Sequence, residues 1–294
     1  MIVSFCILSY NQEQFISECV NSVLAQNYKR LEIIISDDFS SDNTWKIIKS
    51  IAKNYNGPHK LTLNRNQSNL GLTSHYNLVT QKMCSGKYIS VLGGDDIVSE
   101  NHISTAMRYI EKFQNFHLYD FGGELIDRHS NIIKRIKLKH KIKKHNLNDY
   151  IKLKRLKTFA PGRIVSRDLI ERFNKIDSDC PTEDSVLVIR SLLLGGIIRI
   201  DENLVKYRIH SNNISNKIGL KKLSNENIIK QYFKDADLAF NKHIITSRQY
   251  EKLIYRFSFE LKYRNLSKSN SLLILKCKRI LMKLFYKLFT NKNF

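Results

Sequence analysis

Two adjacent carboxylates, Asp95 and Asp96, follow a short apolar run and two glycines in the segment KYISVLGGDDIV, residues 87–98. The apolar run is typical of a strand that is covered on both faces. In an open α/β sheet, ligands bind at the carboxyl ends of the strands, which is where these acids fall. Adjacent carboxylates repel each other unless a cation lies between them or they face water. The segment therefore predicts either a Mg²⁺ or Mn²⁺ site, which oxygen ligands suit, or a solvated turn.

Polar side chains follow two earlier apolar runs in the same way. These runs cover residues 2–8 and 31–36, and the groups that follow all three runs are Ser9, Tyr10, Asn11, Asp37, Asp38, Asp95 and Asp96. Loops that converge at one edge of a parallel sheet make a site large enough for a nucleotide. The sequence has no G-x-G-x-x-G after the first run and no G-x-x-x-x-G-K-[ST], which excludes the dinucleotide-binding and P-loop classes.

Alternating strand and helix patterns must position these loops. Between residues 2 and 100, apolar runs alternate with stretches of helical periodicity in the order βαβαβαβ, which predicts a parallel, helix-covered sheet. Asn11 with Gln14 three residues later resembles a capping box, which predicts a helix that starts directly after Asn11. Later elements are expected as a helix over 99–113, strands over 117–126 and 132–138 in a hairpin, a strand over 159–165, helices from 167 and 186, and a turn and strand over 195–200.

Four motifs in chain order resemble a single enzyme family. They are SYNQEQFISECVNSVLAQ (9–26), EIIISDDFSSDNT (32–44), NLGLTSHYN (69–77) and GKYISVLGGDD (86–96). Their types and spacing are similar to those of family 2 glycosyltransferases of the GT-A fold, which are inverting enzymes that use nucleotide-diphospho-sugars. The resemblance extends over residues 2–215. It implies an α/β, Rossmann-like GT-A catalytic domain over 1–217 with a mostly parallel central sheet. Beyond this domain the family gives no guide, and the helical pattern of the residues themselves predicts a helical C-terminal region over 218–294 that ends in a basic amphipathic helix.

The resemblance also implies a donor site. Asp38 would accept a hydrogen bond from the pyrimidine N3–H, which favours UDP, although thymidine diphosphate presents the same group. Asp96 would be the principal metal ligand, and Asp95 would contact the ribose or the metal. The base pocket would be lined by Ser9, Tyr10 and Asn11. Many members carry a further Asp at the position of Gly94, and the shorter Gly-Asp-Asp form seen here also occurs in the family.

Glu183 and Asp184 precede an apolar helical stretch. Negative charge in the first turn of a helix is favoured by the helix dipole, which by itself would explain both residues. The family pattern, however, has Glu-Asp at this place with the Asp as catalytic base. An inverting transfer needs a carboxylate close to the acceptor hydroxyl, whose proton it removes as the oxygen attacks the anomeric carbon. The resemblance thus implies that Asp184 is the base and that Glu183 positions the acceptor or the loop.

The segment Tyr207 to Ser215 matches the closing motif of the family, Tyr-Arg-x-His-x-x-x-x-Ser. A single His is more often a packing residue than a ligand, but the resemblance implies that His210 approaches the metal or the diphosphate. Arg208 would hold either the loop or the phosphates, since the arginine fork binds two oxygens at once.

Positive charge is unevenly distributed along the chain. The formal charge of +22 comes from 49 basic and 27 acidic residues. This charge indicates binding to nucleic acid, to an anionic membrane or to an anionic substrate, unless it only reflects compositional drift. Residues 134–144 contain many bases and no acid, so they form either a solvated edge or a patch that faces a phosphate-bearing acceptor or anionic lipid. Residues 272–289 place apolar and basic side chains on opposite helix faces, which predicts a membrane-surface helix or one packed on the protein.

Targeting and redox features are sparse. The sequence shows no signal peptide and no apolar run long enough to span a membrane, which predicts a cytoplasmic protein that is peripheral on the membrane. The five cysteines are odd in number, form no C-x-x-C pair and read as small buried hydrophobes in a reducing compartment.

These features together predict a metal-dependent inverting glycosyltransferase that uses Mn²⁺ or Mg²⁺. It would move a sugar, most simply from a UDP-sugar, to a hydroxyl of a glycan or polyprenyl-linked sugar in the assembly of O-antigen, capsule or lipopolysaccharide. A nucleotidyltransferase that makes the sugar nucleotide is one alternative, but it needs a Gly-rich, Arg-containing loop that residues 9–12 lack. A non-enzymatic membrane or nucleic-acid binder is another. It leaves Asp38, Asp95, Asp96 and Asp184 unexplained, and these acids would repel a phosphate backbone, so we expect no nucleic-acid partner.

Overall fold

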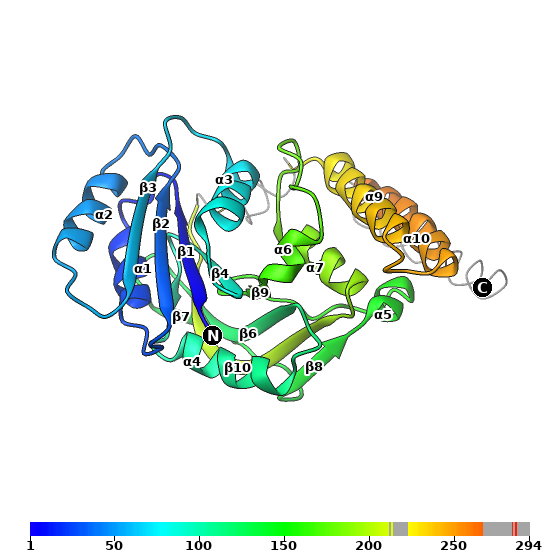
Figure 1. Ribbon diagram of the computed structural model, residues 1–294, viewed down its shortest axis with the longest axis horizontal. Helices are drawn as coiled ribbons and strands as arrows, with labels where there is room; N and C mark the ends of the chain where they lie inside the picture. Colours follow the sequence, from blue (N-terminus) through cyan, green and yellow to red (C-terminus); the bar gives the residue numbers. More distant parts are fainter. Residues whose placement is uncertain (212, 214–222, 267–283, 285, 287–294) are drawn as a thin grey trace.

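The computed structural model describes residues 1–211, 213, 223–266, 284 and 286. Its centre is a 10-stranded sheet in the order β3-β2-β1-β4-β9-β6-β10-β5, with β7 beside β6 and β8 beside β10 (Figure 1). The strands are β1 (Val3–Ser9), β2 (Leu31–Asp37), β3 (Lys60–Arg65), β4 (Tyr88–Gly93), β5 (Ile97–Val98), β6 (Leu118–Ile126), β7 (Ile132–Ile136), β8 (Ile142–His145), β9 (Ile164–Ser166) and β10 (Ile197–Arg208). The helices are α1 (Ile16–Leu24), α2 (Thr44–Lys53), α3 (Leu72–Leu78), the π-helix η1 (Val79–Met83), α4 (His102–Lys112), α5 (Leu147–Ile151), α6 (Arg167–Glu171), α7 (Asp184–Leu193), α9 (Asn225–Asn241) and α10 (Ser247–Leu266).

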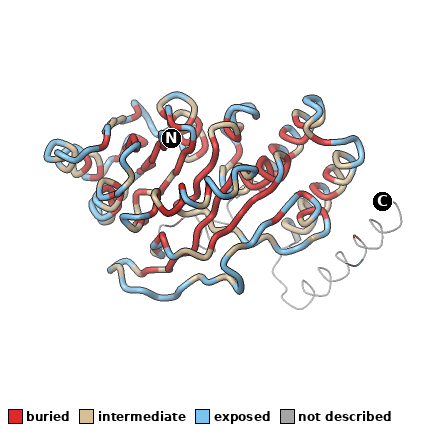
Figure 2. The backbone as a smooth tube through the Cα atoms, turned by 60° about the horizontal axis from the view of Figure 1, so that its bottom comes forward, coloured by how far each residue is buried: buried red, intermediate tan, exposed pale blue. Residues whose placement is uncertain are grey.

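The first four strands confirm the parallel sheet that the sequence predicts. β1 pairs in parallel with both β2 and β4, and β2 pairs in parallel with β3. Because successive side chains of a strand point to opposite faces, β1 contributes to two buried layers. Val3, Phe5 and Ile7 pack with α1, α2 and α4, whereas Cys6 and Leu8 pack on the opposite face with η1, α7 and α9. Figure 2 shows the buried residues concentrated along these central strands.

The second half of the sheet is mixed rather than parallel. β9 is antiparallel to β4 and β6, and β7 forms the predicted hairpin with β6. The expected strand over 195–200 is the first part of a longer one, because β10 continues to Arg208 and pairs in parallel with β6. Ile97 and Val98 pair with β10 as the short strand β5, so the following helix begins at His102 instead of residue 99.

The predicted capping box at Asn11 is wrong. α1 begins only at Ile16, and its N-cap residue Phe15 makes no side-chain cap hydrogen bond. Asn11 has a positive φ of 51°, a conformation that Asn tolerates better than most residues. Its Oδ1 accepts a hydrogen bond from the Ser41 backbone N–H at 2.9 Å, so the side chain joins two loops of the site rather than capping a helix.

The helices α9 and α10 pack side by side and share a continuous apolar layer with the sheet (Figure 1). A buried ion pair fixes α9 to α7, because Arg190 donates to both oxygens of Asp235 at 2.7 and 2.9 Å. The regions before and after residue 217 thus pack against each other through α7 and α9. The domain boundary near residue 217 stays a prediction. Four of the five cysteines, Cys6, Cys19, Cys84 and Cys180, are free and buried, as the sequence predicts.

The predicted basic helix over 272–289 lies outside the described residues except for Leu284 and Tyr286. Tyr286 is buried, donates a hydrogen bond to the Ile151 carbonyl at 2.8 Å and stacks on Tyr255 with ring centroids 5.3 Å apart. In the part of the chain that is described, no helix has the length and apolar character needed to cross a membrane.

Candidate active site

The carboxyl ends of β1, β2 and β4 meet at one edge of the sheet. The register aligns Ser9 with Asp37 and Leu8 with Gly93. Two backbone hydrogen bonds continue this alignment into the loops, since the Asp38 N–H donates to the Ser9 carbonyl at 2.9 Å and the Gly94 N–H donates to the Leu8 carbonyl at 3.0 Å. The loops that the sequence expects to converge therefore lie next to one another.

The buried Asp38 organises the loop that precedes α3. Its carboxylate accepts hydrogen bonds from Asn66 Nδ2 at 2.7 Å, the Leu70 N–H at 2.9 Å and the Gly71 N–H at 3.0 Å. Ser9 is also buried and donates to Asp37 Oδ1 at 3.3 Å, whereas Tyr10 is 48% exposed. Of the predicted base-pocket residues, Tyr10 and Asn11 are therefore exposed to a ligand and Ser9 is not.

Asp95 and Asp96 stand at the end of β4, where the sequence places them. Asp96 is buried, and its Oδ1 accepts a hydrogen bond from the Arg208 N–H at 2.9 Å. Burial and the neighbouring charge of Asp95 raise the pKa of Asp96 well above its ordinary value. Asp95 Oδ2 lies 3.0 Å from His210 Nε2 and 3.4 Å from Asn213 Nδ2. The closing motif after β10 is therefore in contact with the acidic pair.

Gly94 is closely approached by two side chains. A Cβ built there would lie 2.3 Å from Gln12 Oε1 and 2.9 Å from Ile16 Cδ1, which are the far ends of flexible side chains. A larger residue at this position would therefore require both side chains to shift.

Arg208 holds loops together. The side chain is buried, and its Nε donates to the Asp95 carbonyl at 2.9 Å. Nη1 donates to the Asp127 carbonyl at 3.2 Å and to Ser130 Oγ at 3.0 Å, and Nη2 pairs with Glu18 of α1. The guanidinium therefore connects the acidic pair, the turn of the β6–β7 hairpin and α1. Of its two expected roles, this geometry favours loop positioning over phosphate binding.

A divalent cation fits this site by residue type. Two carboxylates and an imidazole are donors that suit Mn²⁺. Burial and the Asp95 charge raise the pKa of Asp96, and a cation bound beside both carboxylates would oppose this shift. Among the described residues, no three His, Cys, Asp or Glu side chains are already gathered as a metal cluster. His210 Nε2 instead contacts Asp95. We assign Asp95, Asp96 and His210 as the residues that would hold the ion.

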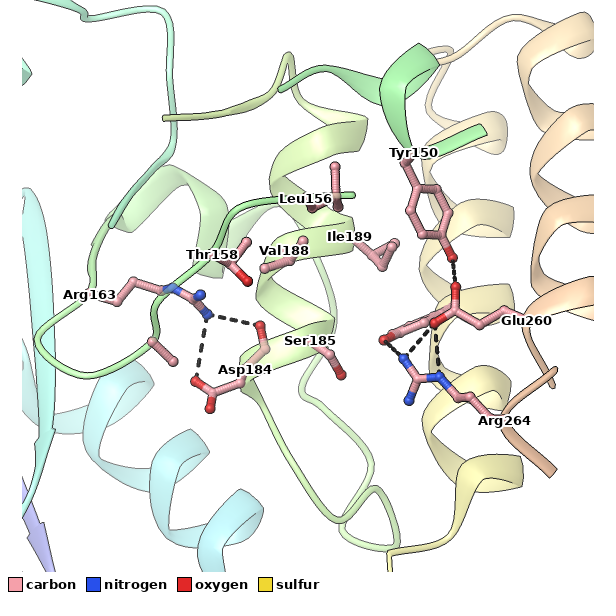
Figure 3. A pocket seen from close by; sticks show the side chains of 12 residues that line it. Tyr150, Leu156, Thr158, Arg163, Asp184, Ser185, Val188, Ile189, Glu260 and Arg264 are labelled. Atoms are coloured by element: carbon pink, nitrogen blue, oxygen red, sulfur yellow. Dashed lines mark hydrogen bonds and ion pairs between the residues drawn. The ribbon is translucent and has the colours of Figure 1, made fainter. Parts of the chain in front are cut away.

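Glu183 and Asp184 lie at the N-terminus of α7, with Asp184 as its first residue. Arg163 approaches Asp184 through Nη1, which donates to the backbone carbonyl at 2.9 Å and lies 3.6 Å from Oδ1 (Figure 3). Arg163 is itself held by Asp120, to which its Nε donates at 2.7 Å. The Asp184 side chain is 53% exposed and lines a cavity. Loss of hydration raises its pKa, although the positive charge of Arg163 opposes the shift. A carboxylate with a raised pKa is a better proton acceptor.

The carboxylate of Asp184 lies within electrostatic range of Asp96, because its charge adds to the raised pKa of Asp96 after burial and the charge of Asp95. Glu183 differs from its neighbour because its Oε2 is buried and has no hydrogen-bond partner within the described chain. Burial and the Asp184 charge raise the pKa of Glu183 to about 8, so it is protonated at neutral pH.

The match to a family model decides the class of this enzyme. The model described as Glycosyl transferase family 2 matches residues 4–173, which include β1 to β9 and the acidic pair. The chain belongs to glycosyl transferase family 2. This membership confirms the resemblance drawn from the four motifs and confirms that the protein is a glycosyltransferase, in place of a nucleotidyltransferase or a non-enzymatic binder.

Other glycosyltransferases match over different lengths. An uncharacterized glycosyltransferase of Haemophilus influenzae is 29% identical over 242 residues, which cover 77% of this chain and 73% of that protein. The abequosyltransferase RfbV of Salmonella typhimurium is 32% identical over 122 residues, which cover 41% of this chain and only 36% of that protein. The crystal structure of S. aureus TarS residues 1–349 with UDP-GlcNAc has a TM-score of 0.68 at 17% identity, over 96% of this chain and 79% of that one. This likeness confirms the GT-A-type fold.

Several residues of this glycosyltransferase site were missed by the sequence analysis. Arg163 and Asp120 form the buried ion pair that supports Asp184, and Glu18 anchors Arg208. Asp120 lies in the middle of a buried strand, where an acid is rare unless it is paired. A buried acid in a strand could therefore have predicted a cationic partner. It could not have identified Arg163, which lies 43 residues later in the sequence.

Glu183→Gln is expected to change the pH dependence of stability. In the folded protein the Glu183 carboxyl keeps its proton up to about pH 8. In the unfolded chain the same carboxyl loses its proton near pH 4.3. Between these two pH values the folded state binds more protons, so the free energy of unfolding falls as pH rises. We expect the Tm of the wild type to fall by roughly 5 °C relative to the variant between pH 5 and pH 8.5, measured by scanning calorimetry. For the control Glu171→Gln, which changes an exposed carboxylate, the Tm difference from wild type should be the same at both pH values. If the Tm difference for Glu183→Gln is also independent of pH, Glu183 does not have a raised pKa in the folded protein.

Proposed function

We propose that this family 2 enzyme is a metal-dependent inverting glycosyltransferase that moves a sugar from a UDP-sugar to a hydroxyl of a glycan or lipid-linked sugar. The observation that carries the proposal is the acidic pair at the end of β4, where Asp96 is buried and Asp95 contacts His210. The TarS structures with UDP-GlcNAc and UDP, and the mannosyltransferase PcManGT with GDP-Man and Mn²⁺, support a nucleotide-sugar donor and a metal.

In the proposed reaction, Asp184 accepts the proton of the acceptor hydroxyl. The acceptor oxygen forms its bond to the anomeric carbon as the bond from that carbon to the diphosphate oxygen breaks, and the electron pair leaves with the nucleoside diphosphate. A Mn²⁺ or Mg²⁺ held by Asp95, Asp96 and His210 would supply positive charge that stabilises the leaving diphosphate. Arg163 orients Asp184, and Arg208 fixes the loops around the acidic pair. The exposed Tyr10 would contact the base, and the backbone hydrogen bonds to Asp38 would hold its carboxylate in place.

The surface-polysaccharide role is supported by RfbV, which is named an abequosyltransferase, and by the distribution of charge. β7 exposes Ile132, Ile133 and Lys134, and residues 134–144 carry many bases and no acid. Exposed basic residues next to apolar ones suit an anionic membrane. We propose that the enzyme works at the cytoplasmic face of the membrane, with the basic helix of residues 272–289 as a second contact.

Titration with nucleotides tests the donor site. We expect UDP, in preference to GDP or CDP, to bind in a Mn²⁺-dependent manner by isothermal calorimetry, with dTDP as the comparison for the N3–H contact. Asp96→Asn should weaken UDP binding in Mn²⁺ by about 100-fold, since a metal contributes several kcal/mol at such a site. Asp237→Asn removes an exposed carboxylate of α9 and should leave binding unchanged. Failure of every nucleotide to bind with metal would contradict the proposal.

A further inference from the structure

A cavity of about 310 Å³ begins beside Asp184 and ends at the C-terminal helices (Figure 3). Asp184 and Arg163 line one end, whereas Tyr232 of α9 and Glu260 and Arg264 of α10 line the other. Figure 3 shows the aliphatic side chains of α7 between the two ends. The cavity therefore connects the proposed base to a part of the chain beyond residue 173, where the match to the family model stops.

The far end of the cavity is a preorganised polar cluster. Glu260 accepts a hydrogen bond from Tyr150 Oη at 2.5 Å, and Arg256 Nη1 lies 2.9 Å from its carboxylate. Arg264 Nε also donates to Glu260 at 2.9 Å, and Arg264 Nη2 donates to Tyr232 Oη at 3.3 Å. The two arginines hold the pKa of Glu260 below its ordinary value, although burial opposes them. The Glu260 carboxylate is therefore charged and fixed in direction between two arginines.

The walls combine the two surfaces that a sugar ring presents. Val188, Ile189 and the rings of Tyr150 and Tyr232 offer apolar area for the C–H faces of a pyranose. Glu260, Arg264 and Tyr232 Oη offer acceptors and donors for its hydroxyls. The volume lies at the lower end of the range of about 300–1,000 Å³ for ligand pockets, which suits a single ring. Along the cavity wall, the two cations Arg163 and Arg264 match the two anions Asp184 and Glu260, so the lining has no net charge that would attract a phosphate or a uronate.

The fold holds this polar cluster at a fixed position relative to the base. α7 begins with Asp184, and its Arg190 is paired with Asp235 on α9, one turn after Tyr232. Both side chains of this ion pair are buried, so the pair fixes α9 against α7. A ring bound at Tyr232 and Glu260 would therefore be held in a defined orientation toward Asp184.

We propose that this cavity is the acceptor subsite and that the α9–α10 pair selects one uncharged pyranose through Tyr232, Glu260 and Arg264. The proposal rests on the transferase function proposed above. The hydroxyl of the bound ring that faces Asp184 loses its proton to that carboxylate, and its oxygen forms the new bond to the anomeric carbon. The nucleoside diphosphate of the donor leaves with the electron pair of the broken bond.

The test measures binding of methyl glycosides to the wild-type protein in the presence of UDP and Mn²⁺, by saturation-transfer NMR. The probes are methyl glucoside, galactoside, mannoside and rhamnoside, with methyl glucuronide as the charged comparison. We expect at least one neutral glycoside to bind saturably. Arg264→Gln should raise the Kd of that glycoside about tenfold or more, because a hydrogen bond to a charged group is lost. Lys262→Gln removes the same charge from an exposed position on α10 and should have no effect.

Tyr232→Phe provides a second variant that keeps the ring and removes only the hydroxyl. It should weaken the same glycoside by a smaller factor, and the Kd of UDP should be unchanged in both variants. Equal glycoside binding by wild type and Arg264→Gln, tighter binding of the glucuronide, or no saturation by any neutral glycoside would each overturn the proposal. If the wild type binds no UDP, the transferase proposal itself fails. If the wild type binds UDP but gives one of these three glycoside results, only the proposal of the acceptor subsite is overturned.

Discussion

Asp184→Asn is expected to lower kcat for glycosyl transfer by about 10³-fold, since a positioned general base contributes on the order of 10²- to 10⁴-fold. The amide cannot accept the proton of the acceptor hydroxyl. The variant keeps the shape of the side chain and its approach to Arg163, which donates mainly to the backbone carbonyl of Asp184. Folding and nucleotide affinity should therefore be preserved. Initial rates with saturating donor and acceptor, together with UDP titrations, measure the two quantities separately.

Asp179→Asn is the matched control for this prediction. Asp179 lies five residues before Asp184 and has an exposed ion pair with Lys230, so the same change should leave kcat within a factor of two. A rate for Asp184→Asn that stays near the wild-type value would remove Asp184 as the base. The Arg163–Asp120 pair would then have to be explained as a purely structural feature of β6 and the loop before β9.

Arg190→Met is expected to destabilise the protein by about 3–5 kcal/mol, because it leaves the buried Asp235 carboxylate without its cation. Gln231 Nε2, which donates to Asp235 at 2.9 Å, would remain as a neutral partner only. Arg190 also donates to the Asn174 carbonyl and lies over the ring of Phe173 at 5.1 Å, so packing is lost as well. Denaturant unfolding followed by circular dichroism measures the loss.

Lys230→Met is the matched control, because Lys230 also joins α9 to the segment before α7. Its ion pair with Asp179 is exposed at both ends, and such pairs contribute at most about 1 kcal/mol. Arg190→Met combined with Asp235→Leu should recover much of the lost stability, since no unpaired charge remains buried. A loss below about 1 kcal/mol for Arg190→Met alone would show that α9 is held by its apolar face and not by the ion pair.

The parallel half of the sheet could be predicted because its signals are local. β1 and β2 are buried along their whole lengths, so their apolar runs are continuous, and α1 and α4 bury one face with helical spacing. The polar loops could be predicted as neighbours because parallel strands in one sheet end at one edge. The motif resemblance then gave these loops a function, and the family match confirmed the class.

The remaining features depend on contacts between residues that are far apart in the chain. The capping box failed because Asn11 bonds to Ser41 instead of the backbone beside it. β5 could not be predicted because it exists only through its pairing with β10, more than 100 residues later. The role of Arg208 is of the same kind, since its acceptors lie on α1, β4 and the β6–β7 turn.

The sequence by itself determined the strand and helix order of the first hundred residues, the acidic pair at the end of β4 and the Glu-Asp step at the start of α7. Periodicity, strand polarity and motif spacing are properties of neighbouring residues, so they are readable without the fold. Only the tertiary structure decided that Arg208 is committed to loops and that Arg163 supports Asp184. It alone showed that α9 and α10 line a cavity that begins at Asp184. These arrangements arise because buried charges must find partners, and the partner is chosen by the fold and not by the order of residues.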